Sequence, residues 1–296
     1  MLSKKKALLI AACFLAPHFI GFLIFLLLPV LETFAISLLD WNMITQPKFV
    51  GFKNYVYMLT NDIFFRKAMI NTVYYTAGSV IIITVTSLVI ALMLNHVKKY
   101  STFFRTMYFV PNVSSLVAVA LIWGWMYNSD FGLINNILRV IGISDPPGWL
   151  TDIRWSMPAV ILMSSWTQIG FFTVIFLAGL QNIPRHVYEA AEIDGGRKFR
   201  IFFNITLPLL RPTTFFVLIM VVINSFQVFE QSYVLTKGGP AFSTTTAVMY
   251  IYYKAFRDQE MGYASALSWG LFLCIFIVTL AQITVQKRWF YYEGRD

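Results

Sequence analysis

The chain has 296 residues, of which 58% are hydrophobic and only 12% are charged. Soluble domains carry about a quarter charged residues, so this composition excludes an ordinary soluble protein and indicates one that lies largely in lipid. The net charge of +9 does not indicate a nucleic-acid partner, because no basic stripe is interleaved with exposed aromatic residues. We expect the basic residues to flank membrane spans instead.

Six apolar stretches are each long enough to cross a bilayer as a helix, which takes about 20 residues. Five of them contain no charged residue, and the fifth in chain order contains only Glu230. The first follows three lysines, as a signal peptide does, but it is too long for one and no small-residue cleavage site ends it. We therefore expect it to be retained. The predicted spans are residues 7–31, 68–95, 106–129, 155–184, 212–236 and 261–286.

Basic residues are unevenly divided between the segments that flank these spans. Six spans place both termini on one side, and the segments on that side carry more of the 23 Lys and Arg residues although they are shorter. The positive-inside rule therefore predicts cytosolic termini. We divide the chain into an N-terminal transmembrane helix with its outer segment (1–66), a transmembrane domain (67–288) and a cytosolic tail (289–296).

The segment between spans four and five, residues 184–212, has a pattern typical of two short helices joined by a hinge. Pro184 suits a first helical turn, and the Glu-Ala-Ala-Glu run that begins at Glu189 favours a helix. Gly195 and Gly196 can adopt positive φ, so we expect them to end this helix and turn the chain. From the residues alone, the segment is either a hairpin that connects two spans or a docking surface.

The order of residues in this segment resembles the EAA loop of binding-protein-dependent ABC importers. The shared pattern is E-A-A-x-x-D-G, followed by an aromatic residue, I-x-L-P and a closing proline. In that family the loop forms a coupling helix that docks in a cleft of the cytosolic ATPase. The family most often has alanine after D-G, where this chain has Gly196. The resemblance implies that the ATPase-coupling residues are Glu189, Ala190, Ala191, Asp194, Gly195 and Gly196.

The segment after span five carries a second resemblance, in a Gly-Gly-Pro sequence that begins at Gly238. This motif is similar to the outer loop of maltose-type permeases of carbohydrate importers, and residues 49–55 and 262–268 are similar to the same branch. The resemblance implies an all-α integral membrane protein with six transmembrane helices and the type I ABC importer permease (MetI-like) fold. It also implies a location in the bacterial cytoplasmic (inner) membrane.

The same resemblance implies a set of partners. They are a second permease subunit in a heterodimer, two ATPase subunits, an extracytoplasmic solute-binding protein, membrane lipid and a carbohydrate substrate such as a sugar, an oligosaccharide or a glycerol-phosphate-like solute. The sequence has no G-x-x-x-x-G-K-[ST] loop, so ATP and Mg are expected on the partner ATPase and no cofactor is expected in this chain. We therefore expect a permease subunit that is not itself an enzyme.

Polar residues within the spans are candidates for a solute path, because they cannot face lipid. At about 100° per residue, four of them fall within an arc of roughly 120° on span five, with aromatic residues largely opposite. They are Asn224, Gln227, Glu230 and Gln231, and the aromatic residues are Phe226, Phe229 and Tyr233. The alternative is that this stripe holds two helices together. Further candidates are Ser164 and Gln168 of span four and Ser268 of span six, where helix packing is also the alternative.

Two other classes of function compete with an importer permease. An ion-coupled secondary transporter or channel subunit would need several intramembrane carboxylates or an inverted repeat, whereas the spans hold only Glu230 and show no repeat. A membrane-embedded enzyme would need a catalytic set, but the three histidines lie near no nucleophile or orienting carboxylate in the sequence. No His or Cys cluster has metal-ligand spacing, so neither a catalytic nor a metal site is predicted.

Overall fold

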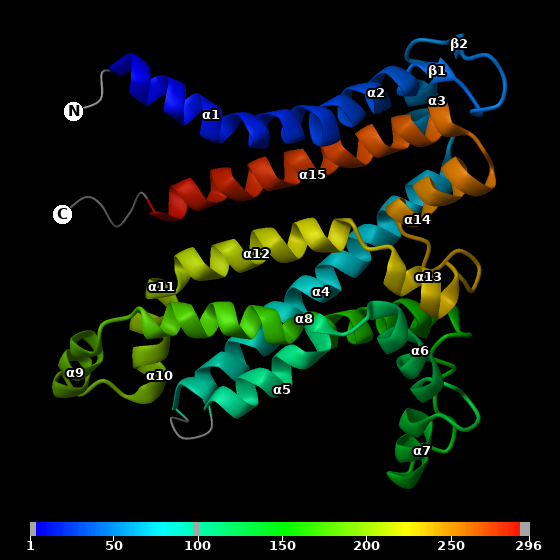
Figure 1. Cartoon of the computed structure of the whole chain (residues 1–296). Helices are drawn as coiled ribbons and strands as arrows, with labels where there is room; N and C mark the ends of the chain where they lie inside the picture. The colour runs from blue at the N-terminus through cyan, green and yellow to red at the C-terminus, as the bar shows by residue number, and fades with distance from the viewer. Residues whose placement is uncertain (1–3, 97–100, 291–296) are drawn as a thin grey trace. The chain divides into compact units, whose positions relative to one another are not determined.

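A computed structural model describes residues 4–96 and 101–290 of the chain. This part is helical apart from one antiparallel pair of very short strands. Its contacts divide it into two compact units, one of residues 1–63 and 251–273 and the other of residues 64–250 and 274–296 (Figure 1). The division predicted from the sequence, with boundaries at residues 66 and 288, stays a prediction.

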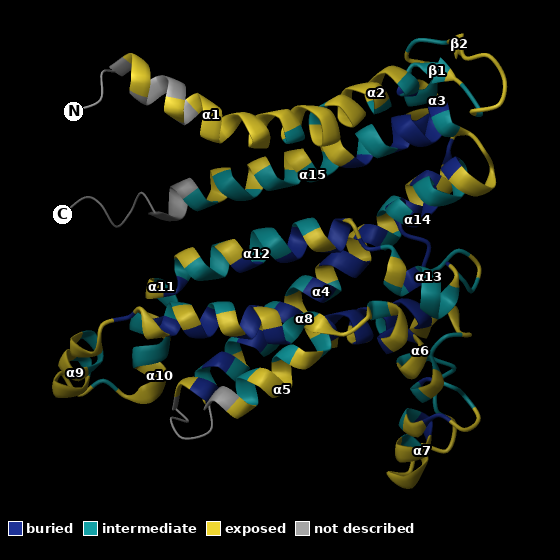
Figure 2. Ribbon diagram, in the orientation of Figure 1, coloured by how far each residue is buried: buried dark blue, intermediate teal, exposed yellow. Residues whose placement is uncertain are grey.

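The first unit begins with a long apolar helical segment. Its elements are α1 (Lys4–Phe22), η1 (Leu23–Leu27), α2 (Leu28–Ser37), β1 (Leu39–Asp40), β2 (Lys48–Phe49), α3 (Lys53–Thr60), η3 (Tyr253–Arg257) and the first half of α15 (Met261–Phe290). The π-helical turn η1 lies directly before α2, whose second residue is Pro29, and the missing N–H of this proline cannot make an α-helical hydrogen bond. The span runs from Ala12 to Ser37, and its most apolar stretch is exposed on this chain (Figure 2).

Hydrogen bonds and a close backbone approach join the end of α2 to α3 and α15. The Asn54 side-chain amide donates to the main-chain carbonyls of Ser37 and Leu39, at 2.9 Å in each case. A Cβ at Gly262 would lie 2.0 Å from the Leu39 carbonyl oxygen, so only glycine allows α15 to begin so close to this turn. These contacts hold α2, α3 and α15 together at one end of the first unit, and they leave no room for a residue larger than glycine at position 262.

A small cluster of charges precedes α15 in the first unit. Lys254 Nζ lies 3.1 Å from Glu260 Oε2 and 3.3 Å from Asp258 Oδ2. Partial burial lowers the pKa of Lys254, but hydrogen bonding and attraction to Glu260, and then to Asp258, outweigh it and raise the pKa above its ordinary 10.5. Burial raises the pKa of Asp258, but hydrogen bonds from Arg257 and Lys254 outweigh it and hold the pKa below its ordinary 3.8. Lys254 and Asp258 are therefore both charged near neutral pH.

The second unit is built around α8, the most buried of the candidate spans (Figure 2). Phe172 and Phe176 of α8 belong to a buried cluster with Ile83 of α4 and Val217 of α12. Helices in lipid associate through close packing rather than through transfer from water, so this cluster positions the other helices. The elements are α4 (Ile63–His96), α5 (Ser101–Val113), α6 (Leu116–Met126), α7 (Leu133–Val140), α8 (Ile153–Gln181), α9 (Arg185–Ile193), α10 (Lys198–Ile201), η2 (Phe202–Thr206), α11 (Leu207–Leu209), α12 (Arg211–Phe226), α13 (Glu230–Thr236), α14 (Ala247–Tyr252) and the second half of α15.

Two of the six predicted spans are not single straight helices. Among the described residues, four helices are long and apolar enough to cross a membrane, or six if each bent pair counts as one span. The third predicted span is split into α5 and α6, which meet at 95° beyond Pro111. The fifth ends as an α-helix at Phe226, and a 65° bend separates α12 from the helical segment before it. The helical membrane class is confirmed, and the spans at these two places are broken or bent rather than single helices.

Candidate functional site

The break between α12 and α13 places polar residues at the edge of a cavity. The backbone leaves the helical conformation at Gln227, where φ is −98° and ψ is 13°, and helix resumes at Glu230 after Phe229. The Val228 carbonyl that the break frees accepts a hydrogen bond from the Thr246 hydroxyl at 2.7 Å. A buried carbonyl that loses its helical partner needs such a replacement, so Thr246 stabilises the break.

A cavity of about 450 Å³ lies beside this break. Three parts of the second unit supply its walls: the junction of α5 and α6, one turn of α8, and the α12–α13 break. The lining residues are Pro111, Asn112, Ser114, Leu116, Thr167, Gln168, Asn224, Gln227, Val228, Phe229, Glu230 and Gln231. The structure therefore brings the four polar candidates of span five together with Gln168 of span four.

The chemistry of these walls suits a solute rich in hydroxyl groups. Five side-chain amides line the cavity, and each can both donate and accept hydrogen bonds. Glu230, which is exposed in the first turn of α13, adds carboxylate oxygens as acceptors. Phe229 adds an aromatic face, and its ring stacks on that of Tyr233 with 5.3 Å between the centroids.

Among the polar and aromatic wall residues, sequence reasoning missed Asn112 and Ser114 and misplaced Phe229. Phe229 was expected opposite the polar stripe because a continuous helix was assumed, but the break turns it into the cavity wall. Asn112 and Ser114 were not considered, although Pro111 beside them is a signal for a break in a span. Two other candidates lie elsewhere: Ser164 is buried in α8 and Ser268 lines a separate pocket of the first unit. A role for these two in a solute path stays a prediction.

Hydrogen bonds join the Gly-Gly-Pro loop, residues 237–246, to α4. Asn71 of α4 donates its amide hydrogens to two carbonyls of this loop, at 2.8 and 3.0 Å, and Lys67 Nζ donates to a third at 2.8 Å. Gly238 has a φ of 84°, and a Cβ there would lie 2.4 Å from a threonine hydroxyl of the same loop. The loop also carries Thr246, so its attachment to α4 supports the helix break that lines the cavity.

The segment 184–212 forms a second candidate site, and its predicted two-helix form is confirmed. Helix α9 ends at Ile193, and Gly195 has a φ of 75°, as expected for the glycine that follows a helix. Gly196 N donates to the Ala191 carbonyl at 2.9 Å, and a Cβ at Gly196 would lie 2.6 Å from that oxygen. The alanine that is usual in the EAA pattern therefore does not fit this turn without a backbone shift.

A groove of about 360 Å³ separates α9 from α10 and η2. It is lined by Val187, Ala190, Ala191, Asp194, Gly196, Arg200, Ile201, Asn204 and Ile205. The small side chains of the E-A-A sequence leave this space, whereas Glu189 is exposed and lies outside the lining. Two large apolar side chains flank the glycine turn and are almost fully exposed, Ile193 at 86% and Phe199 at 81%. Such exposure in a loop marks a contact surface. Sequence reasoning noted Phe199 only as the aromatic residue of the EAA pattern and did not single out Ile193.

A family model described as "Binding-protein-dependent transport system inner membrane component" matches residues 83–291. The chain belongs to this family. The permease is thus the multi-pass inner-membrane subunit of an ABC importer and not its ATPase, and nucleotide is bound by the ATPase partner in such systems. This assignment decides against the ion-coupled transporter or channel that the sequence left as an alternative.

Relatives and solved structures cover almost the whole permease. It is 35% identical to the "Probable ABC transporter permease protein YurN" of Bacillus subtilis (strain 168), over 98% of each chain. It is 39% identical to the "Lactose transport system permease protein LacF" of Rhizobium radiobacter, over 91% of each chain. A chain in the crystal structure of a bacterial alginate ABC transporter, in complex with an alginate pentasaccharide-bound periplasmic protein, superposes with a TM-score of 0.82 at 26% identity, over 96% of each chain. The permease therefore has the fold of the alginate transporter subunit.

Proposed function

We propose that this permease carries a carbohydrate across the inner membrane, and that the cavity beside the α12–α13 break is part of the path. The observation that carries the proposal is the convergence of five amides, a carboxylate and an aromatic ring from three separate segments on one cavity. Lactose and alginate, the solutes named for two of the similar systems above, are both rich in hydroxyl groups. A path for such solutes needs many groups that donate and accept hydrogen bonds.

The energy for transport is proposed to enter through the 184–212 loop, which docks on the ATPase partner. Exposed Ile193 and Phe199 supply apolar contacts on either side of the glycine turn, and the exposed carboxylate of Glu189 lies beside them. The groove between α9 and η2 offers space for a side chain of the partner. Closure of the ATPase then moves α9, and through α11 and α12 it changes access to the cavity. Such switching is a rocking of helical bundles around a central site.

The assembly proposed for the permease follows the alginate transporter, which was crystallised with its periplasmic solute-binding protein. It consists of a second permease subunit, two ATPase subunits and an extracytoplasmic solute-binding protein. Both termini lie in the cytosol in this arrangement, because the side that bears them, together with the 184–212 loop, holds more of the Lys and Arg residues. The same orientation puts the Gly-Gly-Pro loop on the outer side, where the solute-binding protein docks.

The solute path is tested by removing hydrogen-bonding groups from the cavity. Gln231→Leu and Asn224→Leu each replace an amide by an apolar group of similar size, and we expect uptake to fall at least about tenfold because polar solute groups then lose partners. Uptake of a panel of labelled saccharides that includes lactose is measured in cells that carry the complete importer. Gln181→Leu is the matched control, because this exposed amide lies outside the cavity. Parent-level uptake by both cavity variants would show that the stripe only holds helices together.

The coupling role is tested by reversing a charge or stiffening the turn in the loop. Glu189→Lys and Gly195→Pro are expected to reduce co-purification of the ATPase and transport-stimulated ATP hydrolysis, while the permease still folds. Proline cannot adopt the positive φ of Gly195, so the turn itself changes. Asp130→Lys, an exposed charge reversal outside this loop, is the control. Normal co-purification and normal hydrolysis in both loop variants would refute docking through α9.

A further inference from the structure

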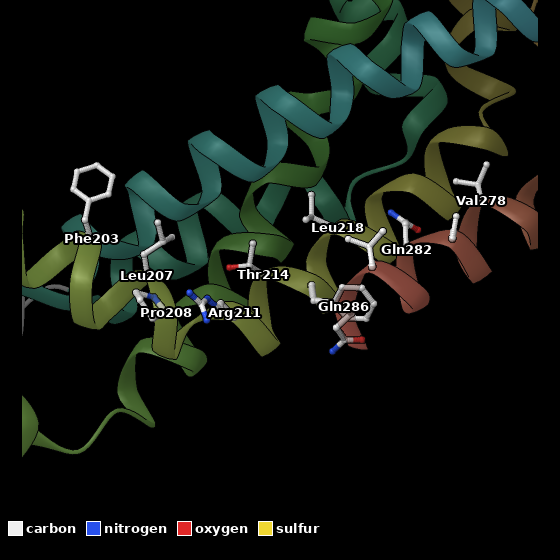
Figure 3. Close-up of a pocket in the computed structure, with 12 residues that line it drawn as sticks. Phe203, Leu207, Pro208, Arg211, Thr214, Leu218, Val278, Gln282 and Gln286 are labelled. Carbon is white, nitrogen blue, oxygen red and sulfur yellow. The ribbon is translucent and has the colours of Figure 1, made fainter. Parts of the chain in front are cut away.

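A second large groove in the second unit lies between α12 and the last turns of α15, away from the polar cavity. It has a volume of about 590 Å³ (Figure 3). Residues Phe203, Leu207 and Pro208 of the 184–212 loop close one end of it. The other lining residues are Arg211, Thr214, Phe215 and Leu218 of α12, and Val278, Ala281, Gln282, Val285 and Gln286 of α15.

The groove is apolar apart from four polar side chains, those of Arg211, Thr214, Gln282 and Gln286. Arg211, Thr214 and Leu218 follow one another along one face of α12, at helical spacings of three and four residues. On α15 the glutamines at 282 and 286 belong to the last turns, and Val278 lies a turn earlier. Arg211 is the only charged side chain among the described residues of this groove. An apolar groove that also offers a cation, a hydroxyl group and two amides matches a molecule that has an anionic head and a hydrocarbon tail.

Two polar atoms of the groove have no hydrogen-bond partner among the described residues. They are Thr214 Oγ1 and Gln282 Oε1, and both are buried. A buried polar atom without a partner is costly, so native structures nearly always satisfy it with protein, water or a ligand. The Thr214 hydroxyl can donate a hydrogen bond, and Gln282 Oε1 can only accept one. A ligand that accepts a hydrogen bond from Thr214 and donates one to Gln282 Oε1 would satisfy both atoms.

We propose that this groove binds an anionic phospholipid whose headgroup carries hydroxyl groups, of the phosphatidylglycerol class. The phosphate accepts hydrogen bonds from the Arg211 guanidinium and the Thr214 hydroxyl, and a glycerol hydroxyl donates to Gln282 Oε1. An acyl chain lies along Phe215, Leu218 and Val278. Basic pockets between transmembrane helices at the cytoplasmic face are the usual sites of anionic lipid headgroups. The depth at which Arg211 lies in the bilayer rests on the cytosolic orientation proposed above.

A lipid fits this groove better than either of two other occupants. A helix of the second permease would present mainly apolar side chains, which would leave Thr214 Oγ1 and Gln282 Oε1 buried without partners. A sugar would place its hydroxyl groups against Leu218, Val278 and Phe215, which offer no hydrogen bonds. A bound lipid also touches Phe203 and Leu207 of the 184–212 loop, so it would stiffen the segment that joins α9 to α12.

The test measures which lipid stays with the complete importer complex. The complex is reconstituted in nanodiscs that contain equal amounts of phosphatidylglycerol and phosphatidylcholine with the same acyl chains, and is then extracted, washed and analysed by lipid mass spectrometry. We expect phosphatidylglycerol to be enriched on the parent complex. Arg211→Gln should reduce this enrichment about tenfold, the size expected for one charge-assisted hydrogen bond. Thr214→Val should reduce it less, and Arg154→Gln, an exposed cation at the start of α8, should leave it unchanged.

Three results would overturn the lipid site. The first is equal retention of the two lipids by the parent complex, and the second is parent-level enrichment in both Arg211→Gln and Thr214→Val. The third is efficient cross-linking of Ala281→Cys to the second permease, which would show that a protein helix fills the groove. Co-purification of the ATPase is recorded in the same samples. Its loss would speak against the docking of the 184–212 loop and not against the lipid site, which the enrichment alone decides.

Discussion

Gly170 lies where α8 crosses α5, next to the wall of the polar cavity. A Cβ at this position would lie 1.8 Å from the Tyr108 carbonyl oxygen and 2.5 Å from its carbonyl carbon. The obstacle is backbone, so it cannot be relieved by turning a side chain. An ordinary contact between carbon and oxygen is about 3.3 Å, so Gly170→Ala requires α5 and α8 to separate locally by about 1.5 Å.

Two opposing effects set the size of the change. Alanine in place of a helical glycine contributes up to about 1 kcal/mol of stability through helix propensity. Forced separation of well-packed elements costs about 1–3 kcal/mol. Gly124 in α6 separates the two effects, because a Cβ there would meet only Leu235 Cδ2, at 3.8 Å. The propensity contribution is common to both variants, so we expect Gly170→Ala to be less stable than Gly124→Ala by the packing cost alone, about 1–3 kcal/mol.

The comparison is made on the purified importer complex heated in steps and then analysed by size-exclusion chromatography. At about 2–4 °C per kcal/mol for a domain of roughly this size, the midpoint of Gly170→Ala should fall below that of Gly124→Ala by at least about 2 °C. Uptake by Gly170→Ala should fall as well, because the α5 wall of the cavity, including Asn112, moves with the crossing. Equal midpoints for the two variants would refute the close crossing of α5 and α8.

Two further predictions concern a buried hydroxyl group and a cluster of charged side chains. Tyr127→Phe removes a buried hydroxyl that donates to a carbonyl of α8 at 3.0 Å, and we expect a loss of about 1 kcal/mol in the same heating assay. The Lys254–Asp258–Glu260 cluster should contribute evenly to stability from about pH 5 to pH 9, because the lowered pKa of Asp258 loses its contribution only in acid and the raised pKa of Lys254 only in alkali. Hydrogen exchange of residues 253–260, corrected for intrinsic rates, measures this contribution, and a transition between about pH 6 and pH 8 would contradict the assignment.

The two-helix form of the 184–212 loop could be predicted because it depends on the conformational preferences of neighbouring residues. Helix formers followed by two glycines indicate a helix and its end, and the structure places Gly195 in the left-handed conformation that this requires. The straight spans were predictable for the same reason, since length and apolarity alone qualify them. Neither inference depends on contacts between distant parts of the chain.

Distant contacts hold the two breaks in the third and fifth predicted spans, and the sequence carries a local signal only for the first of them, at Pro111. The α12–α13 break has no glycine or proline, and the hydroxyl that satisfies Val228 comes from Thr246, 18 residues further along. A helical wheel on a continuous helix grouped Asn224, Gln227, Glu230 and Gln231 on one side, and these residues do line one cavity, although the helix is not continuous. The same assumption put Phe229 on the wrong side. A broken span holds its polar residues together through tertiary contacts, which periodicity does not report.

The bend between α5 and α6 has a consequence for how the chain enters the membrane during synthesis. The two helices have 13 and 11 residues, so neither crosses a bilayer alone, since this takes about 20. The insertion machinery therefore has to accept them together as one hydrophobic segment. The contacts that fix the bend, at Gly170 and at the Tyr127 hydroxyl, involve α8, which the ribosome makes later. We expect nascent chains that stop before residue 150 to have only the local kink at Pro111, and the bend to reach its final angle only when α8 has been inserted.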